Sequence, residues 1–541
     1  MESPAATPCL DCQRLRAQLE ELQATVAQLQ DQIAQVRKET PEPAPSAEKL
    51  PRPKAEPVRG AERVASVDVL RGVALLGILA MNVVFFGLPG PCYDNPTRGG
   101  GDAGLNLGLW AFNHVVFDAK MMTLFSMLFG AGLVLMGGRA DARGARLGWV
   151  YYRRVFWLLV IGLLHAYLLW SGDILVLYAL CGLLLYPLRR LSPRALLIVG
   201  TLVMLVILPV GVVIEGGVRF LQATAAKAEA VRREAVPNRA RWAAEAGALA
   251  AQAQFRQSLG AGPAPCLAAA AEAAATATRE DKKPTRFQSW VAELWSQGAR
   301  SHFEPTPEEA AESFDKEVRV YRGGLGGIVA HNAWQLLVTH TVIFLVALVW
   351  MIAGRMLVGM GLMKLGVFAA ARSWRFYVWM AVLGYGVGLP LVGYDTYALL
   401  RSHFHFPDDL RSGYLFNYLG SVPVALGHAA VVMLACQAGA LPGLRACLAA
   451  VGRMALTNYL MQSVLCTTLF YGYGVGLYGK LDRTGLACVV LAVWAAQLAW
   501  SPLWLRYFRF GPAEWLWRSL TYWRLQPLRR AAEPAVAEAA A

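Results

Sequence analysis

Long runs of apolar residues recur along the chain, each about the length needed to cross a lipid bilayer. A helix spans the hydrocarbon core with about 20 apolar residues. Windows close to this length lie near residues 68–88, 112–136, 155–170, 174–188, 195–215, 334–354, 376–397, 415–436, 447–470 and 485–503. The pattern predicts an all-α fold, a polytopic membrane bundle of about ten transmembrane helices.

Charged residues avoid these windows and gather in the short loops between them. Of the 541 residues, 56% are hydrophobic and only 16% are charged. With the N-terminus placed inside, the loops assigned to the cytoplasm hold fourteen Lys and Arg residues, Arg355 and Arg453 among them, and the short external loops hold five. The positive-inside rule then predicts that both termini are cytoplasmic. The net charge of +14 follows from this bias and from anionic lipid headgroups, so no nucleic-acid partner is predicted.

The first 40 residues follow a different period. Apolar residues recur at alternating spacings of four and three, at Leu15, Leu19, Leu22, Val26, Leu29, Ile33 and Val36. With Cys12 they fill the a and d positions of a heptad repeat, and Leu at most d positions favours a parallel dimer. The segment is therefore predicted to be a coiled coil that joins two chains through residues 12–36. A single amphipathic helix packed on the membrane domain is the alternative.

Two polar segments divide the rest of the chain. A proline-rich stretch after the coiled coil is typical of a semi-rigid linker. A segment rich in Ala, Glu and Arg between the fifth and sixth windows is predicted to be an external helical insertion, either a cap over the outer mouth of the bundle or a solvated insertion without a direct role. The predicted order is coiled coil 1–40, linker 41–63, first membrane half 64–216, insertion 217–333, second membrane half 334–505 and basic cytoplasmic tail 506–541.

Polar side chains inside the apolar windows are costly in lipid and are candidate functional residues. The stretch VGRMALTNYLMQS predicts that Arg453, Asn458 and Gln462 lie on related faces of one helix. Together the candidates form a polar track from one side of the membrane to the other. They are Asp68, Arg71, Asn82, His114, Asp118, Lys120, Arg153, Arg154, His165, Asp173, Arg453, Asn458 and Gln462.

The stretch GLLHAYLLWSGDIL contains the two candidates with the clearest chemistry. His165 lies about 16 Å along a helix from Arg154, at 1.5 Å per residue, and so near the middle of the bilayer. An imidazole there can take a proton from an acceptor or accept an acyl group itself. Asp173, on the hairpin that follows, could fix its tautomer. The alternative is a buried His–Asp pair that only pins two helices together.

Five stretches resemble the YeiB family of bacterial membrane proteins, a domain of unknown function. They are SVDVLRGVALLGILAMNVVFFGLPG, KMMTLFSMLFGAG, GLLHAYLLWSGDIL, VGRMALTNYLMQSVLCTTLFYG and WLRYFRFGPAEWLWRSLT, and the resemblance covers about residues 64–522. The coiled coil, the linker and much of the insertion depart from the family pattern. The opening V-D-x-x-R-G and the helix layout are also remotely similar to transmembrane acyltransferases such as heparan-α-glucosaminide N-acetyltransferase.

The remote resemblance implies an enzyme of the bacterial inner membrane. It would move an acyl group from cytosolic acyl-CoA, most simply acetyl-CoA, to a glycan or lipid acceptor at the outer face, with no bound cofactor and no metal. His165 would be the base and Asp173 its orienting partner. His114 is the rival base, because the catalytic histidine of the lysosomal enzyme also lies near the start of the second span. The substrate would be bound by Asp68, Arg71, Asn82, Lys120, Arg153, Arg154, Arg453, Asn458 and Gln462.

Two other classes of function compete with this one. A transporter or exporter of a small or lipid-linked solute could use the same polar track. A scaffold could assemble through the coiled coil and carry a catalytically inactive membrane part. Binding and turnover of acyl-CoA would distinguish the acyltransferase from both.

Overall fold

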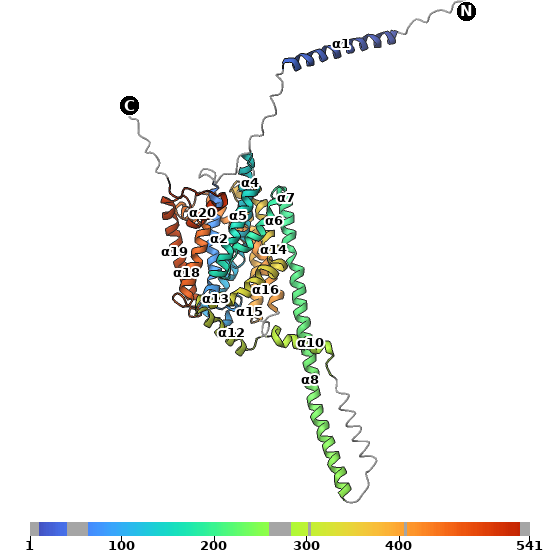
Figure 1. Ribbon diagram of the computed structural model, residues 1–541, viewed down its shortest axis with the longest axis vertical. Helices are drawn as coiled ribbons and strands as arrows, with labels where there is room; N and C mark the ends of the chain where they lie inside the picture. Colours follow the sequence, from blue (N-terminus) through green and yellow to red (C-terminus); the bar gives the residue numbers. More distant parts are fainter. Residues whose placement is uncertain are drawn as a thin grey trace, which may run out of the picture. The chain divides into compact units, whose positions relative to one another are not determined.

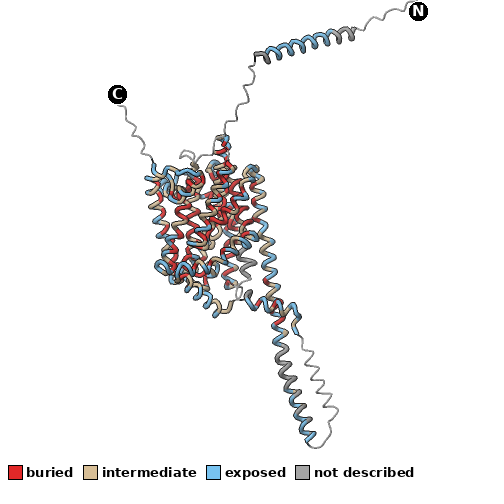
Figure 2. Tube along the Cα trace, viewed as in Figure 1, coloured by how far each residue is buried: buried red, intermediate tan, exposed pale blue. Residues whose placement is uncertain are grey.

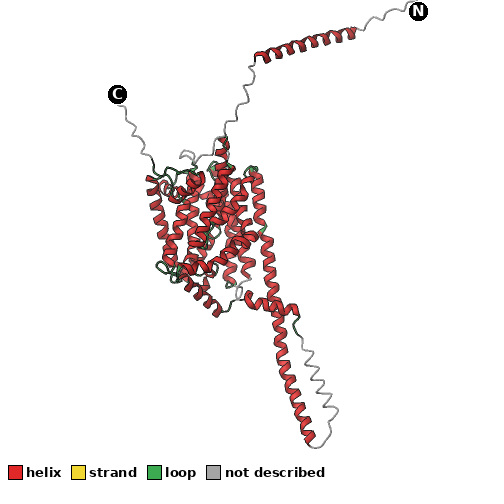
Figure 3. Ribbon diagram, in the orientation of Figure 1, coloured by secondary structure: helices red, strands yellow, loops and turns green. Residues whose placement is uncertain are grey.

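The described part of the chain is built from helices. The computed structural model describes residues 10–39, 63–145, 147–258, 283–300, 305–404 and 408–530. Within these ranges the regular elements are helices, and the one β-type pairing is an isolated bridge between Phe508 and Arg529 (Figure 3). The predicted all-α class is confirmed. Apart from Arg63, the predicted linker 41–63 lies outside the described residues, as does the end of the tail, 531–541.

Helix α1 (Leu10–Glu39) belongs to a separate unit, residues 1–54. Its apolar stripe is exposed, with Leu22 and Leu19 at 69% and 60% relative accessibility and Val26 at 48% (Figure 2). The helix forms where the heptad pattern places one. Pairing of two such helices stays a prediction.

The second unit, residues 55–541, contains the membrane domain. Seven of its described helical segments are long and apolar enough to cross a membrane. In chain order they are α2 (Ala65–Gly87), α3 with α4 (Gly104–Val116, Lys120–Ala142), α7 with the start of α8 (Pro193–Leu205, Ile207–Ser258), α13 with η5 and α14 (Leu325–Val338, Thr339–Leu348, Val349–Lys364), α15 (Trp374–Arg401), α16 (Asp408–Gln437) and α19 (Arg483–Tyr507). Four shorter helices, α5 (Gly148–Leu168), α6 (Leu175–Leu188), α17 (Pro442–Arg453) and α18 (Ala455–Phe470), occupy the other predicted windows. The domain is a polytopic helix bundle, and the total of about ten spans stays a prediction.

The two ends of the bundle carry different elements, with α20 (Pro512–Tyr522) at one end and α10 (Arg286–Leu294) and α12 (Pro307–Tyr321) at the other (Figure 1). One end carries Arg71, Arg154, Arg453 and the short helix α20, and we call it the basic end. The other end carries the helices of the predicted insertion, and we call it the insertion end. These helices are the distal part of α8, α10, η4 (Trp295–Ala299) and α12. The loop after α2, with the short 3-10 helices η2 (Gly90–Cys92) and η3 (Pro96–Arg98), lies at the same end.

Small residues let the central helices approach closely. A Cβ added at Gly130 on α4 would collide with the carbonyl of Met356 on α14, and one at Gly359 on α14 would collide with the carbonyl of Met127 on α4. Both neighbours are backbone atoms, which cannot turn aside as a side chain can. Close contact between small residues is the usual way in which membrane helices associate.

Two predicted spans are interrupted where the polar residues lie. The second breaks between α3 and α4 at Ala119, which has a left-handed backbone with φ of 57°. The ninth breaks at Met454, between α17 and α18. The prediction that Arg453 and Asn458 share one helix is therefore wrong. A new helix begins between them because the carboxylate of Glu514 on α20 accepts hydrogen bonds from the first free backbone N–H groups of α18.

Arg355 also departs from the expected position. It was assigned to a cytoplasmic loop, but the apolar run continues past it, and the structure places it inside α14 with no exposed surface. A charge in this position is rare in a membrane helix, so Arg355 is a candidate functional residue.

Candidate functional site

A pocket of about 310 Å³ lies at the basic end between α2, α4, α5, α18 and α20. Seven arginines and two carboxylates line it. They are Arg63, Arg71, Arg139, Arg143, Arg154, Arg453, Arg518, Asp68 and Glu514. The deeper wall is apolar and aromatic, with Phe125, Phe129, Leu158 and Tyr459 among its residues. We call it the arginine pocket. Its excess of guanidinium groups suits an anionic ligand such as a phosphate, and its deeper wall suits an apolar one.

Local contacts hold the arginines in place. Asp68 faces Arg71 at 3.1 Å and Arg63 at 3.4 Å. The guanidinium of Arg154 lies 3.6 Å from the ring centre of Trp517, whose indole N–H donates to the Arg154 carbonyl. On α20, which lies outside the spans, burial lowers the pKa of Arg518 to about 10. That side chain remains charged at neutral pH.

Four of the predicted substrate-binding residues meet in this pocket, and five lie elsewhere. Asp68, Arg71, Arg154 and Arg453 line it, whereas the neighbouring Arg153 does not. Five of the predicted residues line neither this pocket nor the second cavity described below: Asn82, Lys120, Arg153, Asn458 and Gln462. Of these, Lys120 is buried next to residues that line that cavity.

Asn458 and Gln462 join α18 to α19 instead. The amide of Gln462 donates to Gln497, whose own amide donates to the Asn458 carbonyl, each at 2.9 Å. The side chain of Asn458 also bonds Ser501 and Trp500 at 3.0 and 2.9 Å. Each amide group has a partner, so the network has little capacity left for a ligand.

His165 lies at the centre of a buried hydrogen-bonded chain. Its Nδ1 is 2.7 Å from Asp173 Oδ1, and its Nε2 is 2.8 Å from Ser463 Oγ. The other oxygen of Asp173 accepts the backbone N–H of Val176 at 2.7 Å, at the start of α6. A carboxylate only accepts, so Nδ1 carries a proton, and in the singly protonated ring Nε2 can accept the Ser463 hydroxyl proton. This is the order of nucleophile, base and orienting group found in acyl-transferring hydrolases.

One side chain separates this chain from the arginine pocket. Tyr459 lines the pocket and lies one helical turn before Ser463, with its ring centre 5.1 Å from that of His165. Ile174, next to Asp173, also lines the pocket, and its N–H donates to the Tyr459 hydroxyl at 3.3 Å. The buried chain therefore lies directly behind the pocket wall.

Ser463 escaped the sequence reasoning. It follows Gln462 in the motif VGRMALTNYLMQS, but a serine in a membrane helix usually bonds its own backbone, and nothing in its spacing distinguishes it. The sequence does place Ser463 on the same helix face as Tyr459, four residues earlier, and this spacing indicates that the two side chains are neighbours.

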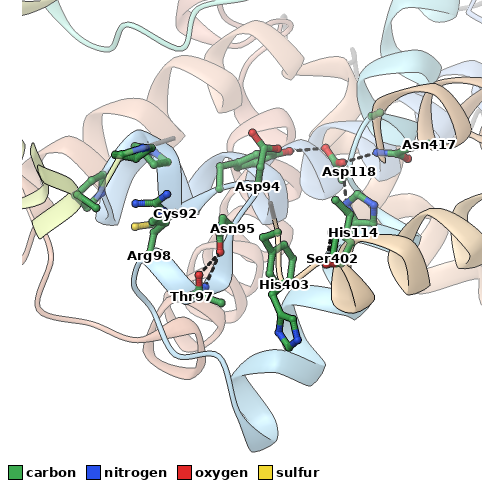
Figure 4. Close-up of a pocket in the computed structure, with 18 of the residues that line it drawn as sticks. Cys92, Asp94, Asn95, Thr97, Arg98, His114, Asp118, Ser402, His403 and Asn417 are labelled. Atoms are coloured by element: carbon green, nitrogen blue, oxygen red, sulfur yellow. Dashed lines mark hydrogen bonds and ion pairs between the residues drawn. The ribbon is translucent and has the colours of Figure 1, made fainter. Parts of the chain in front are cut away.

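A second and larger cavity, of about 1780 Å³, lies at the insertion end (Figure 4). The loop after α2, the break between α3 and α4, and helices α8, α12, α14 and α16 line it, and we call it the large cavity. Residues of α12 such as Glu309, Phe314 and Glu317 form part of its wall. This part of the predicted insertion forms one wall of the cavity. Whether the insertion is a cap stays a prediction, and its residues 259–282 and 301–304 lie outside the described ranges.

His114 and Asp118 sit in the wall of the large cavity (Figure 4). His114 Nε2 is 2.8 Å from Asp395 on α15, and its Nδ1 is 3.3 Å from Asp118. Lys120 is fully buried and donates to the His114 carbonyl at 2.6 Å and to Asn417 at 2.5 Å. The break at Ala119 frees the carbonyl that Lys120 binds, so the irregular backbone is itself part of the cluster.

Comparison with known proteins agrees with the sequence blocks. Residues 362–524 match the family model described as "Protein of unknown function (DUF418)". The chain is 30% identical to the uncharacterized protein YeiB of Escherichia coli K12, over 88% of this chain and 99% of that protein. The chain belongs to the YeiB family. Another similar protein is the uncharacterized YxaH of Bacillus subtilis 168, at 28% identity over 88% of this chain and 98% of that protein. No solved structure matches the chain.

Both candidate sites of this YeiB-family protein combine residues from inside and outside the DUF418 segment. Ser463 and Asp395 fall inside residues 362–524, while His165, Asp173 and His114 precede it. Neither site is complete within the matched segment.

Proposed function

We propose that this protein is a membrane acyltransferase. It takes an acyl group from acyl-CoA at the basic end and delivers it to a glycan or lipid acceptor at the insertion end. The observation that carries the proposal is the Asp173–His165–Ser463 chain directly behind the arginine pocket.

The arginine pocket suits the donor. Coenzyme A carries phosphates at one end and a thioester on a slender arm at the other. Seven arginines supply charge-assisted hydrogen bonds for the phosphates. The apolar wall beyond them suits the arm, with the thioester against Tyr459.

The buried chain suits the chemistry. Ser463 Oγ attacks the thioester carbonyl while His165 Nε2 takes the hydroxyl proton, and the thiolate leaves with that proton as free CoA. The acceptor hydroxyl or amine then attacks the acyl-serine ester. His165 takes the acceptor proton and returns it to Ser463, so the enzyme ends as it began. Asp173 holds the proton on Nδ1 throughout, and the Tyr459 ring has to swing aside for the thioester to reach Ser463.

His114 is a poorer candidate for the catalytic base than His165. Both of its ring nitrogens face carboxylate oxygens, an arrangement that favours the doubly protonated ring. An imidazolium has no free lone pair and cannot take a proton. We therefore assign the base to His165 and retain His114 as the next residue to test.

The two cavities approach each other along α4. Ala119 lines the large cavity and Phe125 lines the arginine pocket. Six residues of helix correspond to about 9 Å. The walls of the donor and acceptor sites would thus lie less than two helical turns apart along this segment.

The test uses purified protein in detergent with acetyl-CoA labelled in the acetyl group. Release of free CoA thiol and transfer of label to lipid or glycan acceptors are measured for wild type, Ser463→Ala, His165→Ala and Asp173→Asn. We expect a loss of roughly a hundredfold or more for the first two, with no further loss in the double variant, because they act as one unit.

A matched control separates chemistry from stability. Ser501→Ala removes another buried, hydrogen-bonded serine on α19 that does not touch His165. It should lower thermal stability slightly and leave turnover within about twofold of wild type, since a neutral hydrogen bond contributes about 1 kcal/mol. Full activity in His165→Ala would refute the mechanism. A pair with only a structural role would lower the melting temperature of His165→Ala and leave turnover unchanged.

A transporter of a small or lipid-linked solute is the second candidate. The interrupted helix pair α3 and α4, with Lys120 and Asp118 at the break, is the observation that favours it, because broken membrane helices often hold transported solutes. Thiol release from acetyl-CoA by the purified protein separates the two functions, since a transporter leaves the thioester intact.

We further propose the setting of this activity. The protein lies in the bacterial inner membrane with both termini in the cytoplasm, so that the basic end meets cytosolic acyl-CoA. Two chains associate through α1.

A further inference from the structure

Arg355 on α14 is buried and has no hydrogen-bond partner among the residues that the structure describes. Its side chain has no exposed surface, and none of its three guanidinium nitrogens bonds any residue in the described part of the chain. Its guanidinium carbon lies 5.3 Å from the ring centre of Tyr418. Both residues line the large cavity. A buried unpaired charge is strongly unfavourable, so it calls for a counter-charge.

The neighbouring polar cluster does not supply that counter-charge. It holds two cations, Lys120 and the His114 ring, whose two nitrogens each face a carboxylate. The two carboxylates are Asp118 and Asp395. These charges cancel within the cluster. The positive charge of Arg355 is left over.

Asp118, the cluster carboxylate that lines the cavity, is already engaged. One oxygen accepts the Tyr93 hydroxyl at 2.5 Å, and the other accepts the Asn417 amide at 2.8 Å beside His114 (Figure 4). It therefore has little capacity left for a guanidinium.

Other carboxylates in the cavity wall also have partners. Glu215 pairs with Arg219 at 3.0 Å, and Glu309 pairs with Arg300. Glu317 accepts the Gly90 N–H at 3.0 Å and the Tyr478 hydroxyl at 2.9 Å. The bonds of Glu309 and Glu317 tie α12 to the segment after η4 and to the loops after α2 and α18, and none of these bonds involves Arg355.

We propose that Arg355 docks an oxyanion, a carboxylate or phosphate, of a ligand that enters the large cavity. The planar guanidinium offers parallel N–H groups that match two oxygens of such a group. The cavity, about 1780 Å³, has room for a sugar acid or a lipid headgroup with part of its chains. If the proposed acyl transfer holds, this ligand is the acceptor, and the acceptor is anionic. That last step rests on the proposed function.

Binding is measured without acyl-CoA, so the outcome does not depend on transfer activity. Protein purified in an uncharged maltoside detergent is titrated with three probes, namely inorganic phosphate, glucuronate and dihexanoyl phosphatidylglycerol. Dissociation constants and melting temperatures are recorded for each. The probe that binds most tightly distinguishes a soluble phosphate, a sugar acid and a lipid headgroup as the source of the oxyanion.

Two variants and a control test the role of Arg355. Arg355→Met removes the charge at similar length and should weaken binding of the preferred probe by roughly ten- to a hundredfold, the scale of a charge-assisted hydrogen-bonded contact. Arg355→Lys keeps the charge without the two-pronged geometry and should fall between Met and wild type. Arg401→Gln changes an exposed arginine at the insertion end that lies outside the cavity lining and should bind as wild type does.

The unliganded proteins provide an independent readout. Because Arg355 is an unpaired buried cation, Arg355→Met without ligand should melt at the same temperature as wild type or higher. The inference is overturned if no probe binds wild type, or if Arg355→Met binds as tightly as wild type. It is also overturned if Arg355→Met fails to fold or melts several degrees lower, because the arginine would then have a structural partner.

Discussion

Glu514 on α20 holds the start of α18, and its replacement tests how the wall of the arginine pocket is built. Its carboxylate accepts the backbone N–H groups of Leu456 at 2.6 Å and Thr457 at 3.1 Å. It also accepts the Thr457 hydroxyl at 2.5 Å. Glu514→Ala removes all three interactions and leaves two backbone donors at the start of a helix without partners.

The expected cost follows from those donors. An unsatisfied buried donor costs about 1–3 kcal/mol. Because the site is partly buried and borders the pocket, water can reach some of these groups and the Thr457 hydroxyl can rotate. We therefore expect the free energy of unfolding to fall by about 2–4 kcal/mol. Glu514→Gln keeps one acceptor oxygen and should lose about 1 kcal/mol.

The pKa of Glu514 determines how its contribution to stability changes with pH. Burial raises the pKa of the Glu514 carboxyl above its ordinary value of 4.5. The folded protein then holds the proton more tightly than the unfolded chain does. The contribution of Glu514 to stability is largest below the unfolded pKa and falls as the pH rises through the folded pKa. The melting temperature of wild type relative to Glu514→Gln, which does not titrate at this position, should decrease as the pH is raised from about 4.5 to 7.

Tryptophan fluorescence during a thermal ramp in detergent measures these differences, with Glu312→Ala on the exposed face of α12 as the control. We expect Glu514→Ala to melt several degrees below wild type and Glu312→Ala to match it. An unchanged melting temperature for Glu514→Ala would show that α18 starts at Ala455 without this cap. A pH-independent difference between wild type and Glu514→Gln would refute the raised pKa.

Three further predictions concern assembly, orientation and helix packing. Leu22→Lys should abolish self-association of a peptide of residues 1–40, measured by sedimentation, because it places like charges at facing d positions. The predicted dimer is contradicted if the wild-type peptide is monomeric at tens of micromolar, a concentration at which a coiled coil of this length should associate. A cysteine at Ser289 should react with an impermeant maleimide in intact cells and one at Arg143 should not, and the reverse pattern would invert the proposed orientation. Gly359→Ala should lower stability by about 1–3 kcal/mol, because its Cβ would meet the Met127 carbonyl, and an unchanged melting temperature would contradict the close crossing.

The sequence patterns predicted the features that depend on residues close together in the chain. The helices follow from apolar runs of bilayer length, and the positions of His165 and Asp173 follow from a hairpin only eight residues long. Ser463, which completes the chain, is 298 residues away in sequence. Its contact with His165 depends on how α5 and α18 pack, which no local pattern encodes.

Two errors have the same origin. The helix break at Met454 contains no glycine or proline and depends on Glu514, 58 residues beyond Leu456. Arg355 was placed in a loop because a charge normally ends an apolar window, yet α14 continues for nine residues after it. In the first case a distant carboxylate sets the helix start, and in the second the packing around a cavity accommodates the charge.

The position of α20 has a consequence for how the protein is made. Glu514, Trp517 and Arg518 belong to a helix that follows every membrane-spanning segment in the chain, yet they form one wall of the arginine pocket and cap α18. When all of these segments have been inserted into the bilayer, the arginine pocket still lacks the wall that α20 provides. Nascent or truncated chains that stop before Pro512 can be inserted and anchored, but they lack one wall of the arginine pocket. The pocket is therefore incomplete until translation has passed this helix.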